Sequence, residues 1–307
     1  MLSSTEESQA EFSTSPSLSK VYSGSTKIFS LMRQVYWGPE LLNLGLYPSL
    51  GWLGFLINGL RTISTAQRRL VNHAIALIGV EAGDHVVDIA CGRGGSSFML
   101  RHSTPAASVH AIDLLAENIE MAKCLFPADD RLFYTRADAQ FLPFPDGMFH
   151  KALCCEAAFH FPDRGRFLME THRVLQSQGR LVVVDFVWRT PAHRACRTQS
   201  MGQIVRNIWG WDDMSSECEY KAMAEQAGLQ LVRSLDWTAT VTRAIQQRSE
   251  CAVWLSKRAW GRGILKRLCP MLSSFTESDW SQLEIEVAAH RFLHDNTYYK
   301  AMVFQKP

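Results

Sequence analysis

The apolar positions of the chain switch repeatedly between a helical and a strand spacing. Residues 65–80 place apolar side chains at helical intervals, whereas residues 85–90 form a short apolar run rich in β-branched residues, typical of a strand buried on both faces. The switch recurs and predicts strands over 108–113, 132–136, 150–155 and 180–186 and helices over 94–102, 116–125 and 164–175. Alternating strands and helices predict an α/β fold with a parallel sheet, whose ligands bind beyond the carboxyl ends of the strands.

Two longer segments interrupt this alternation after the fifth predicted strand. Residues 188–217 precede a sixth strand near 229–237, and residues 238–296 precede a last strand at 297–306 (TYYKAMVFQK), which we expect to be antiparallel. A structureless loop of such length is uncommon inside a compact domain. We therefore expect both segments to be helical and to form walls of an acceptor pocket.

The first 64 residues differ in composition from the rest. Residues 1–18 are rich in Ser, Thr and Glu, without a long apolar run or a cleavage signature, which predicts a disordered tail rather than a signal peptide. The stretch from Leu41 to Leu60 is apolar, but Asn43, Pro48 and Asn58 interrupt it. We therefore predict no membrane-spanning helix and no stable membrane insertion.

A glycine-rich turn follows the first predicted strand, in residues 84–97 (DHVVDIACGRGGSS). Its glycines let the backbone approach a ligand closely and present N–H groups at the start of a helix. A dinucleotide-binding motif requires the spacing G-x-G-x-x-G. The corresponding positions here are Gly92, Gly94 and Ser97, so serine replaces the third glycine. Asp88 would repel a pyrophosphate but attract the ammonium group of an amino acid, which favours S-adenosylmethionine as the cofactor.

These features resemble the class I S-adenosylmethionine-dependent methyltransferases over residues 70–190. VVDIACGRGG is similar to the first motif of that family, with Ala90 where many members have glycine. LPFPDGMFH and the later FPDRGRFLMETHRVLQSQGRLVVVDF resemble the branch that methylates small molecules, including ubiquinone, tocopherol and sterol methyltransferases and natural-product tailoring enzymes. The resemblance implies a Rossmann-like fold with a mostly parallel seven-stranded sheet, an antiparallel last strand, an N-terminal lid and helical insertions.

The resemblance also implies which residues contact the cofactor. Asp113 matches the acidic residue that binds the ribose hydroxyls, and Asp138 with Ala139 matches the pair that holds the adenine. The residues expected to contact S-adenosylmethionine are Asp88, Ala90, Gly92, Gly94, Asp113, Leu114, Asp138, Ala139, Glu156 and Tyr22. The expected organisation is a tail (1–18), a helical lid (19–64), a cofactor-binding core (65–187, 218–237 and a last strand within 297–307) and two helical insertions at the acceptor pocket (188–217 and 238–296).

Three side chains are candidates for catalysis. Methyl transfer requires an acceptor aimed at the methyl group, and a base only where the acceptor loses a proton. His160 follows the fourth strand, where the resembling O-methylating enzymes have a histidine, and Asp185 matches an acidic position beside it. O-methylation with His160 as the base is therefore the favoured prediction. A structural role for His160 fits the sequence equally well, and Glu156 is either a second base or a helix-cap acceptor.

Aromatic residues predict a mainly apolar acceptor pocket, although any one of them fits a packing role better. The residues expected to line it are Tyr36, Trp37, Tyr47, Phe159, His160, Trp188 and Trp209. The acceptor is thus expected to be a small hydrophobic molecule of secondary metabolism. Three alternatives stay open: C-methylation of an isoprenoid or aromatic acceptor through a stabilised carbocation, another reaction such as a cyclisation, and non-catalytic binding.

The net charge and the spacing of the cysteines limit the classes of binding partner that the sequence supports. The net charge is +2 with scattered Lys and Arg, which gives no indication of a nucleic-acid partner. We interpret the one basic cluster, Lys257 to Arg267, as a solvated helix face. The eight cysteines lack metal-binding spacing, and the adjacent Cys154 and Cys155 point to opposite faces of a strand, which predicts reduced thiols, a cytoplasmic setting and no metal site. The sequence leaves homodimerisation open.

Overall fold

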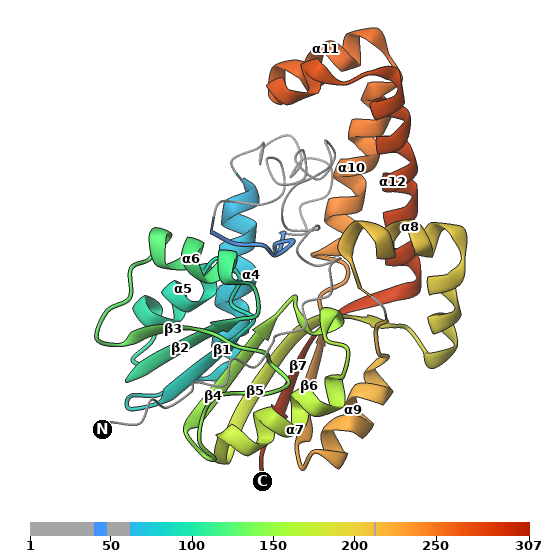
Figure 1. Ribbon diagram of the computed structural model, residues 1–307. Helices are drawn as coiled ribbons and strands as arrows, with labels where there is room; N and C mark the ends of the chain where they lie inside the picture. Colours follow the sequence, from blue (N-terminus) through green and yellow to red (C-terminus); the bar gives the residue numbers. More distant parts are fainter. Residues whose placement is uncertain (1–39, 48–61, 212) are drawn as a thin grey trace, which may run out of the picture.

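A seven-stranded sheet forms the centre of the molecule in the computed structural model, which describes residues 40–47, 62–211 and 213–307 (Figure 1). Its strands are β1 (His85–Ile89), β2 (Ser108–Asp113), β3 (Leu132–Arg136), β4 (Phe149–Cys155), β5 (Leu175–Trp188), β6 (Gln230–Asp236) and β7 (Thr297–Gln305). They follow the order β3-β2-β1-β4-β5-β7-β6, and β7 runs antiparallel to both of its neighbours. The predicted mostly parallel α/β fold with an antiparallel last strand is confirmed.

Helices cover both faces of the sheet. They are α4 (Thr62–Ile78), α5 (Gly95–Ser103), α6 (Ala116–Leu125), α7 (Arg164–Val174), α8 (Ser200–Trp209), α9 (Glu217–Gln226), α10 (Thr242–Ser256), α11 (Ala259–Leu268) and α12 (Glu277–Asn296), with short 3-10 helices η1 (Ala158–His160), η2 (Pro191–Thr198) and η3 (Pro270–Ser274). One face packs against α4, α5 and α6, and the other against α7 and α9. Val86 and Val87 of β1 are fully buried on opposite faces, as expected for a strand in the middle of the sheet.

The order of the strands places a crevice between β1 and β4. The chain moves from β1 to β2 and β3 on one side of the sheet, and then returns to β4 and β5 on the other side. Loops that leave the carboxyl ends of β1 and β4 therefore diverge, and ligands of α/β proteins bind at this point.

One strand begins earlier than its sequence predicts. Leu175 pairs with Phe149, and regular pairing resumes at Arg180 after an irregularity in register. The intervening polar residues include Gln178, whose φ of 64° is typical of a turn. The expected start of this strand at residue 180 was wrong, because the turn at Gln178 lies within β5 and the strand already begins at Leu175.

Three helices form an arm that projects away from the sheet. Figure 1 shows α10 and α12 side by side, with α11 across their far ends, and α12 also packs on α8. The tip has its own small core, built from Leu265, Cys269, Leu272, Phe275 and Trp280. Among the described residues, no helix has the length and apolarity needed to cross a bilayer.

Gly94 provides a test of how tightly the turn after β1 is packed. Its φ is 82°, and a Cβ atom there would lie 2.9 Å from Ala122 Cβ and 3.1 Å from the Tyr134 hydroxyl oxygen. We expect Gly94→Ala to lower the free energy of unfolding by at least about 1–2 kcal/mol, the cost of a left-handed conformation alone. The measurement is urea-induced unfolding.

Gly263→Ala in α11 is the matched control for this substitution. No atom lies within 4 Å of a Cβ at Gly263. Alanine is favoured over glycine inside a helix by about 1 kcal/mol, so the control should be slightly stabilised. A Gly94→Ala protein as stable as the unmutated one would show that the turn is not tightly packed.

Candidate active site

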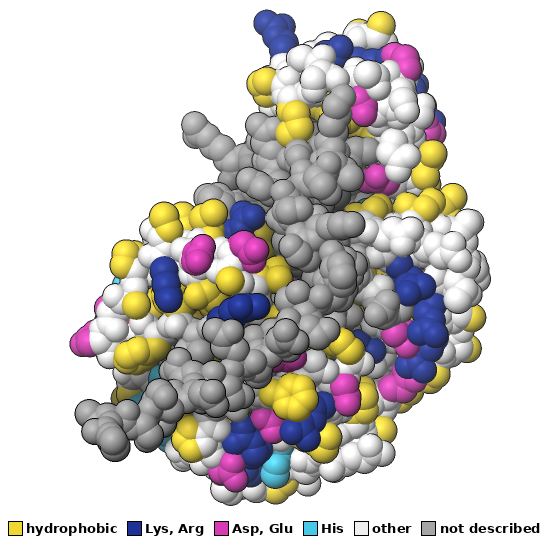
Figure 2. Space-filling view, in the orientation of Figure 1, with side chains coloured by type: hydrophobic (Ala, Val, Ile, Leu, Met, Phe, Trp, Pro, Cys, Tyr) yellow, Lys and Arg dark blue, Asp and Glu magenta, His cyan; other side chains and the backbone are white. Residues whose placement is uncertain are grey.

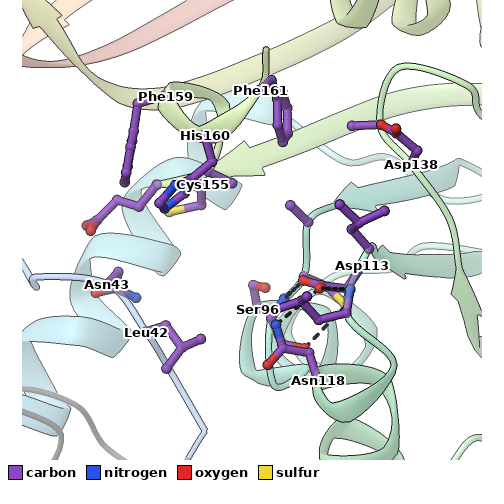
Figure 3. A pocket seen from close by; sticks show the side chains of 18 of the residues that line it. Leu42, Asn43, Ser96, Asp113, Asn118, Asp138, Cys155, Phe159, His160 and Phe161 are labelled. Atoms are coloured by element: carbon purple, nitrogen blue, oxygen red, sulfur yellow. Dashed lines mark hydrogen bonds between the residues drawn. The ribbon is translucent and has the colours of Figure 1, made fainter. Parts of the chain in front are cut away.

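A cavity of about 220 Å³ lies at the carboxyl ends of the parallel strands (Figure 3). Residues that follow four strands line it: 90–92 after β1, 113–115 at the end of β2, 137–140 after β3 and 155–157 at the end of β4, together with 159–162 in and after η1. Residues 40–43 close one side. The cavity therefore coincides with the crevice that the strand order predicts.

Asp113 fixes the loop on the β1 and β2 side of the cavity. Its Oδ2 accepts a hydrogen bond from the N–H of Gly92 at 2.9 Å, and its Oδ1 accepts from the N–H of Leu115 at 2.9 Å and from Asn118 Nδ2 at 3.1 Å (Figure 3). Burial raises the pKa of Asp113 to about 6, although these three donors oppose the shift. The carboxylate is thus held in one orientation at the cavity wall.

Asp88 lies behind the wall rather than on it. The structure buries this carboxylate, and its Oδ2 accepts hydrogen bonds from the hydroxyls of Ser96 and Ser97, both at 2.6 Å. Burial raises the pKa of Asp88 to about 6. Neither Asp88 nor Gly94 lines the cavity, whereas Ser96 does. Both residues therefore shape the turn from which the lining residues project.

The loop after β3 supplies a further acceptor. Asp138 lines the cavity, and its Oδ1 accepts a hydrogen bond from the N–H of Gln140 at 2.8 Å. Ala139 and Leu114 line the cavity nearby. This part of the wall combines one carboxylate with small or apolar side chains, which suits a flat heterocycle with exocyclic polar groups.

Glu156 joins three separate parts of the chain. It follows β4 with a φ of 52°, and its Oε1 accepts hydrogen bonds from the N–H of Leu44 at 2.9 Å and from the hydroxyl of Tyr299 in β7. Burial raises the pKa of Glu156 to about 7, because desolvation outweighs these two donors. A carboxyl group that faces the cavity can therefore exchange a proton near neutral pH.

His160 and Asp185 occupy different environments. His160 lines the cavity, and burial lowers its pKa to about 4, so the ring is neutral at pH 7. Asp185 is fully buried outside the lining: its Oδ2 accepts from the Tyr220 hydroxyl at 2.6 Å and its Oδ1 from the N–H of Phe186 at 2.8 Å. Both oxygens of the carboxylate that the sequence suggested as a partner for His160 thus already accept hydrogen bonds.

Asn43 is a lining residue that the sequence did not single out. The residue is 5% exposed, and its Oδ1 makes no hydrogen bond with any residue that the structure describes. Gln67 Nε2 holds the backbone of this segment by donating to the carbonyl oxygens of Leu41 at 3.2 Å and Asn43 at 2.7 Å. A buried acceptor left without a donor fits a ligand that brings N–H or O–H groups.

Comparison with known proteins identifies the family. The family model "Methyltransferase domain" matches residues 87–183. A ubiquinone/menaquinone biosynthesis C-methyltransferase of Citrifermentans bemidjiense is 30% identical over 205 residues, which cover 61% of this chain and 87% of that protein. The chain belongs to the class I S-adenosylmethionine-dependent methyltransferases. It is a methyltransferase of the small-molecule branch, and its cofactor is S-adenosylmethionine.

Two further comparisons extend this picture of the methyltransferase. The 27-O-demethylrifamycin SV methyltransferase of Amycolatopsis mediterranei is 26% identical over 221 residues, covering 71% of this chain and 76% of that protein. The structure of geranyl diphosphate C-methyltransferase from Streptomyces coelicolor, solved with S-adenosyl-L-homocysteine, matches with a TM-score of 0.66 over 96% of this chain and 99% of that one, at 17% identity. The relatives thus include O- and C-methylating enzymes.

The aromatic residues predicted for the acceptor pocket of the methyltransferase are dispersed. Tyr36 and Trp37 lie outside the described residues, as does Tyr22, which was predicted as a cofactor contact, and Phe159 lines the cavity. Tyr47 packs on Ala66 and Ile245, Trp188 is buried against Trp211, and Trp209 Nε1 donates to His290 Nε2 at 2.8 Å. These last three aromatic side chains lie outside the lining, as do residues 238–296 of the predicted second insertion.

The buried carboxylates of the methyltransferase predict a pH-dependent stability. Burial raises the pKa of Asp185 from 3.8 to about 7. Between these values the unfolded chain ionises while the folded protein keeps the proton, so stability present below about pH 4 is lost as the pH rises through about 7. We expect Asp185→Asn to reduce the difference in unfolding free energy between pH 5 and pH 8.

Asp130→Asn is the control, because the Asp130 side chain is 85% exposed. It should keep the pH dependence of the unmutated protein. Equal pH dependence in the Asp185→Asn protein would mean that Asp185 ionises alike in the folded and unfolded states. The comparison uses urea unfolding of the cofactor-free protein.

Proposed function

We propose that this methyltransferase transfers the methyl group of S-adenosylmethionine to a hydroxyl oxygen of a hydrophobic small molecule of natural-product metabolism. The observation that carries this proposal is the composition of one cavity. Figure 3 shows Asp113, Ser96 and Asn118 on one side, and His160, Cys155 and Phe159 on another. Groups suited to a nucleoside and groups suited to an apolar acceptor thus face the same space.

The lining residues fit the cofactor by their hydrogen-bonding capacity. We propose that Asp113 accepts hydrogen bonds from the ribose hydroxyls and that Asp138 with Ala139 contacts the adenine, since all three residues line the cavity. Asn43 and Glu156 offer acceptors for the ammonium end, while Ala90, Gly92 and Leu114 contribute the surrounding wall. The cofactor supplies an electrophilic methyl group on a positive sulfonium, and the carboxylates of this edge give the cavity a complementary negative potential.

Two side chains are candidates for taking the proton of a hydroxyl acceptor. His160 is neutral at pH 7 and therefore available as a base throughout the physiological range. Glu156 has a pKa close to the working pH, where general bases are most effective. We propose His160 as the base and Glu156 as the second candidate. Asp185 would act indirectly, because it accepts hydrogen bonds from the Tyr220 hydroxyl and from the N–H of Phe186 behind the cavity.

C-methylation is the second candidate function. Glu156 faces a cavity that Phe159 and Phe161 also line. A carboxylate and aromatic faces stabilise a developing carbocation and direct its loss of a proton. One of the relatives is a C-methyltransferase. The acceptor would then be an isoprenoid or an aromatic ring carbon rather than a hydroxyl oxygen.

Product analysis tests these proposals directly. Purified protein is incubated with methyl-labelled S-adenosylmethionine and fractionated small-molecule extracts, and the labelled product is identified. A labelled methyl ether supports O-methylation, and a labelled C-methyl group supports the second candidate. Cofactor binding with a changed acceptor but no S-adenosylhomocysteine would contradict both and support a cyclisation. Cofactor binding without any changed acceptor would support a non-catalytic role.

Asp113→Ala tests the proposed ribose contact. Hydrogen bonds to a charged group contribute about 1.5–3 kcal/mol, so affinity for S-adenosylmethionine should fall by roughly tenfold to a hundredfold. The measurement is calorimetric titration, with Asp130→Ala as an exposed control that should bind normally. Unchanged affinity of Asp113→Ala would remove this residue from the proposed contact.

The pH dependence of kcat distinguishes the two bases. With His160 as the base, kcat should be flat between about pH 5.5 and 8, and His160→Ala should lower it by about 10²–10⁴-fold without changing cofactor affinity. With Glu156 as the base, kcat should rise with pH through about 7, and Glu156→Gln should abolish the rise. Full activity of both variants would exclude a base role for either residue.

A further inference from the structure

The tip of the arm exposes a cluster of large apolar side chains. Trp260, Ile264 and Leu268 recur every four residues along α11 and are 57%, 43% and 56% exposed. Trp254 at the end of α10 is 50% exposed, and its ring centroid lies 5.8 Å from that of Trp260. The described residues include eleven exposed large hydrophobic residues, and four of them are these. Exposed apolar side chains are therefore concentrated at the tip of the arm.

The outward direction of this stripe is fixed by packing. Gly261 and Leu265 are buried on the neighbouring face of α11, and Leu265 belongs to the core of the tip. A Cβ atom at Gly261 would lie 2.2 Å from the carbonyl oxygen of Leu255 in α10. Because α11 approaches α10 so closely through this glycine, it cannot rotate to bury Trp260, Ile264 and Leu268.

The tip also carries a net positive charge. Residues 251–280, which contain the core residues of the tip, include five Lys or Arg and two acidic residues, Glu277 and Asp279. Lys257 and Arg262 form ion pairs with Glu284 and Glu277 of α12. Lys266 also lies near enough to Glu277 to help lower the pKa of that carboxyl, whereas Arg258 and Arg267 form no ion pair within the described part of the chain. Figure 2 shows Lys and Arg side chains beside hydrophobic ones at the end of the arm.

We propose that the tip of the arm docks on the surface of an anionic lipid bilayer. A short helix with Trp and aliphatic residues on one face and Lys and Arg beside them lies in the interface, with its apolar side chains among the acyl chains and its cations at the headgroups. Tryptophan is favoured at this boundary because it is amphipathic. Each cation near an anionic surface adds about 1 kcal/mol of attraction.

Charge favours a bilayer over a second copy of the chain as the occupant. Two copies of this tip placed face to face would bring the cations of both copies together, among them Arg258 and Arg267, whereas anionic headgroups neutralise them. Docking would also place the enzyme beside membrane-dissolved apolar molecules. That consequence rests on the proposed function, but the docking itself does not.

Vesicle flotation tests the proposal with the full chain and without cofactor or acceptor, so its outcome is separate from that of the activity assays. We expect binding to vesicles of phosphatidylglycerol and phosphatidylcholine, and weak binding to phosphatidylcholine alone. Binding should weaken at high salt, because the screening length falls from about 10 Å at 0.1 M to about 3 Å at 1 M. Equal binding to both vesicle types, or none to either, overturns the proposal.

Variants locate the contact. Lys266→Glu with Arg267→Glu, and separately Ile264→Ser with Leu268→Ser, should each lower vesicle binding at least about tenfold. Lys123→Glu with Lys221→Glu and Met121→Ser with Met169→Ser are matched controls at exposed positions outside the arm and should bind normally. Circular dichroism verifies that all four variants are folded. Normal binding by both tip variants, or dimerisation through the tip in gel filtration, overturns the proposal.

Discussion

Four carboxylates at one edge of the central sheet must find hydrogen-bond donors inside the protein. Asp88, Asp113, Glu156 and Asp185 lie at or near the carboxyl ends of β1, β2, β4 and β5, and burial raises the pKa of each. An ionised carboxylate without such donors costs several kcal/mol when buried. The donors are mainly hydroxyls and backbone N–H groups. The conformation of the loops around the cavity is therefore stabilised by their hydrogen bonds to these carboxylates.

This requirement ties distant segments together. Glu156 accepts from Leu44 and from Tyr299, which joins the segment 40–47 to the last strand across the end of β4. The neighbouring Asn43 lines the cavity, and its side-chain Oδ1 has no donor within the described residues. This edge of the sheet therefore combines an acceptor available to a ligand, Asn43 Oδ1, with the negative potential of the carboxylates. Both features suit a positively charged cofactor, as proposed for S-adenosylmethionine.

The arm is stabilised by apolar packing rather than by hydrogen bonds to buried carboxylates. Its small core is sufficient to orient α11, and the close approach at Gly261 leaves one apolar stripe with no partner among the described residues. The sequence alone favoured a solvated helix face for the basic run Lys257 to Arg267. The structure adds that the exposed Trp254 and Trp260 share this surface, which supports the membrane docking proposed above.

The sequence by itself determined the α/β fold and the positions of nearly every strand, because buried strands and amphipathic helices have distinct periods that no distant contact needs to supply. It also located Asp113, Asp138, Glu156 and His160 at the cavity, since each follows a predicted strand. Only the tertiary structure decided which side chains face that space. It buried Asp88 and Asp185 among hydroxyl donors, placed Trp188 and Trp209 away from the cavity, and brought Asn43 into it, because such contacts join residues far apart in the chain and leave no local pattern.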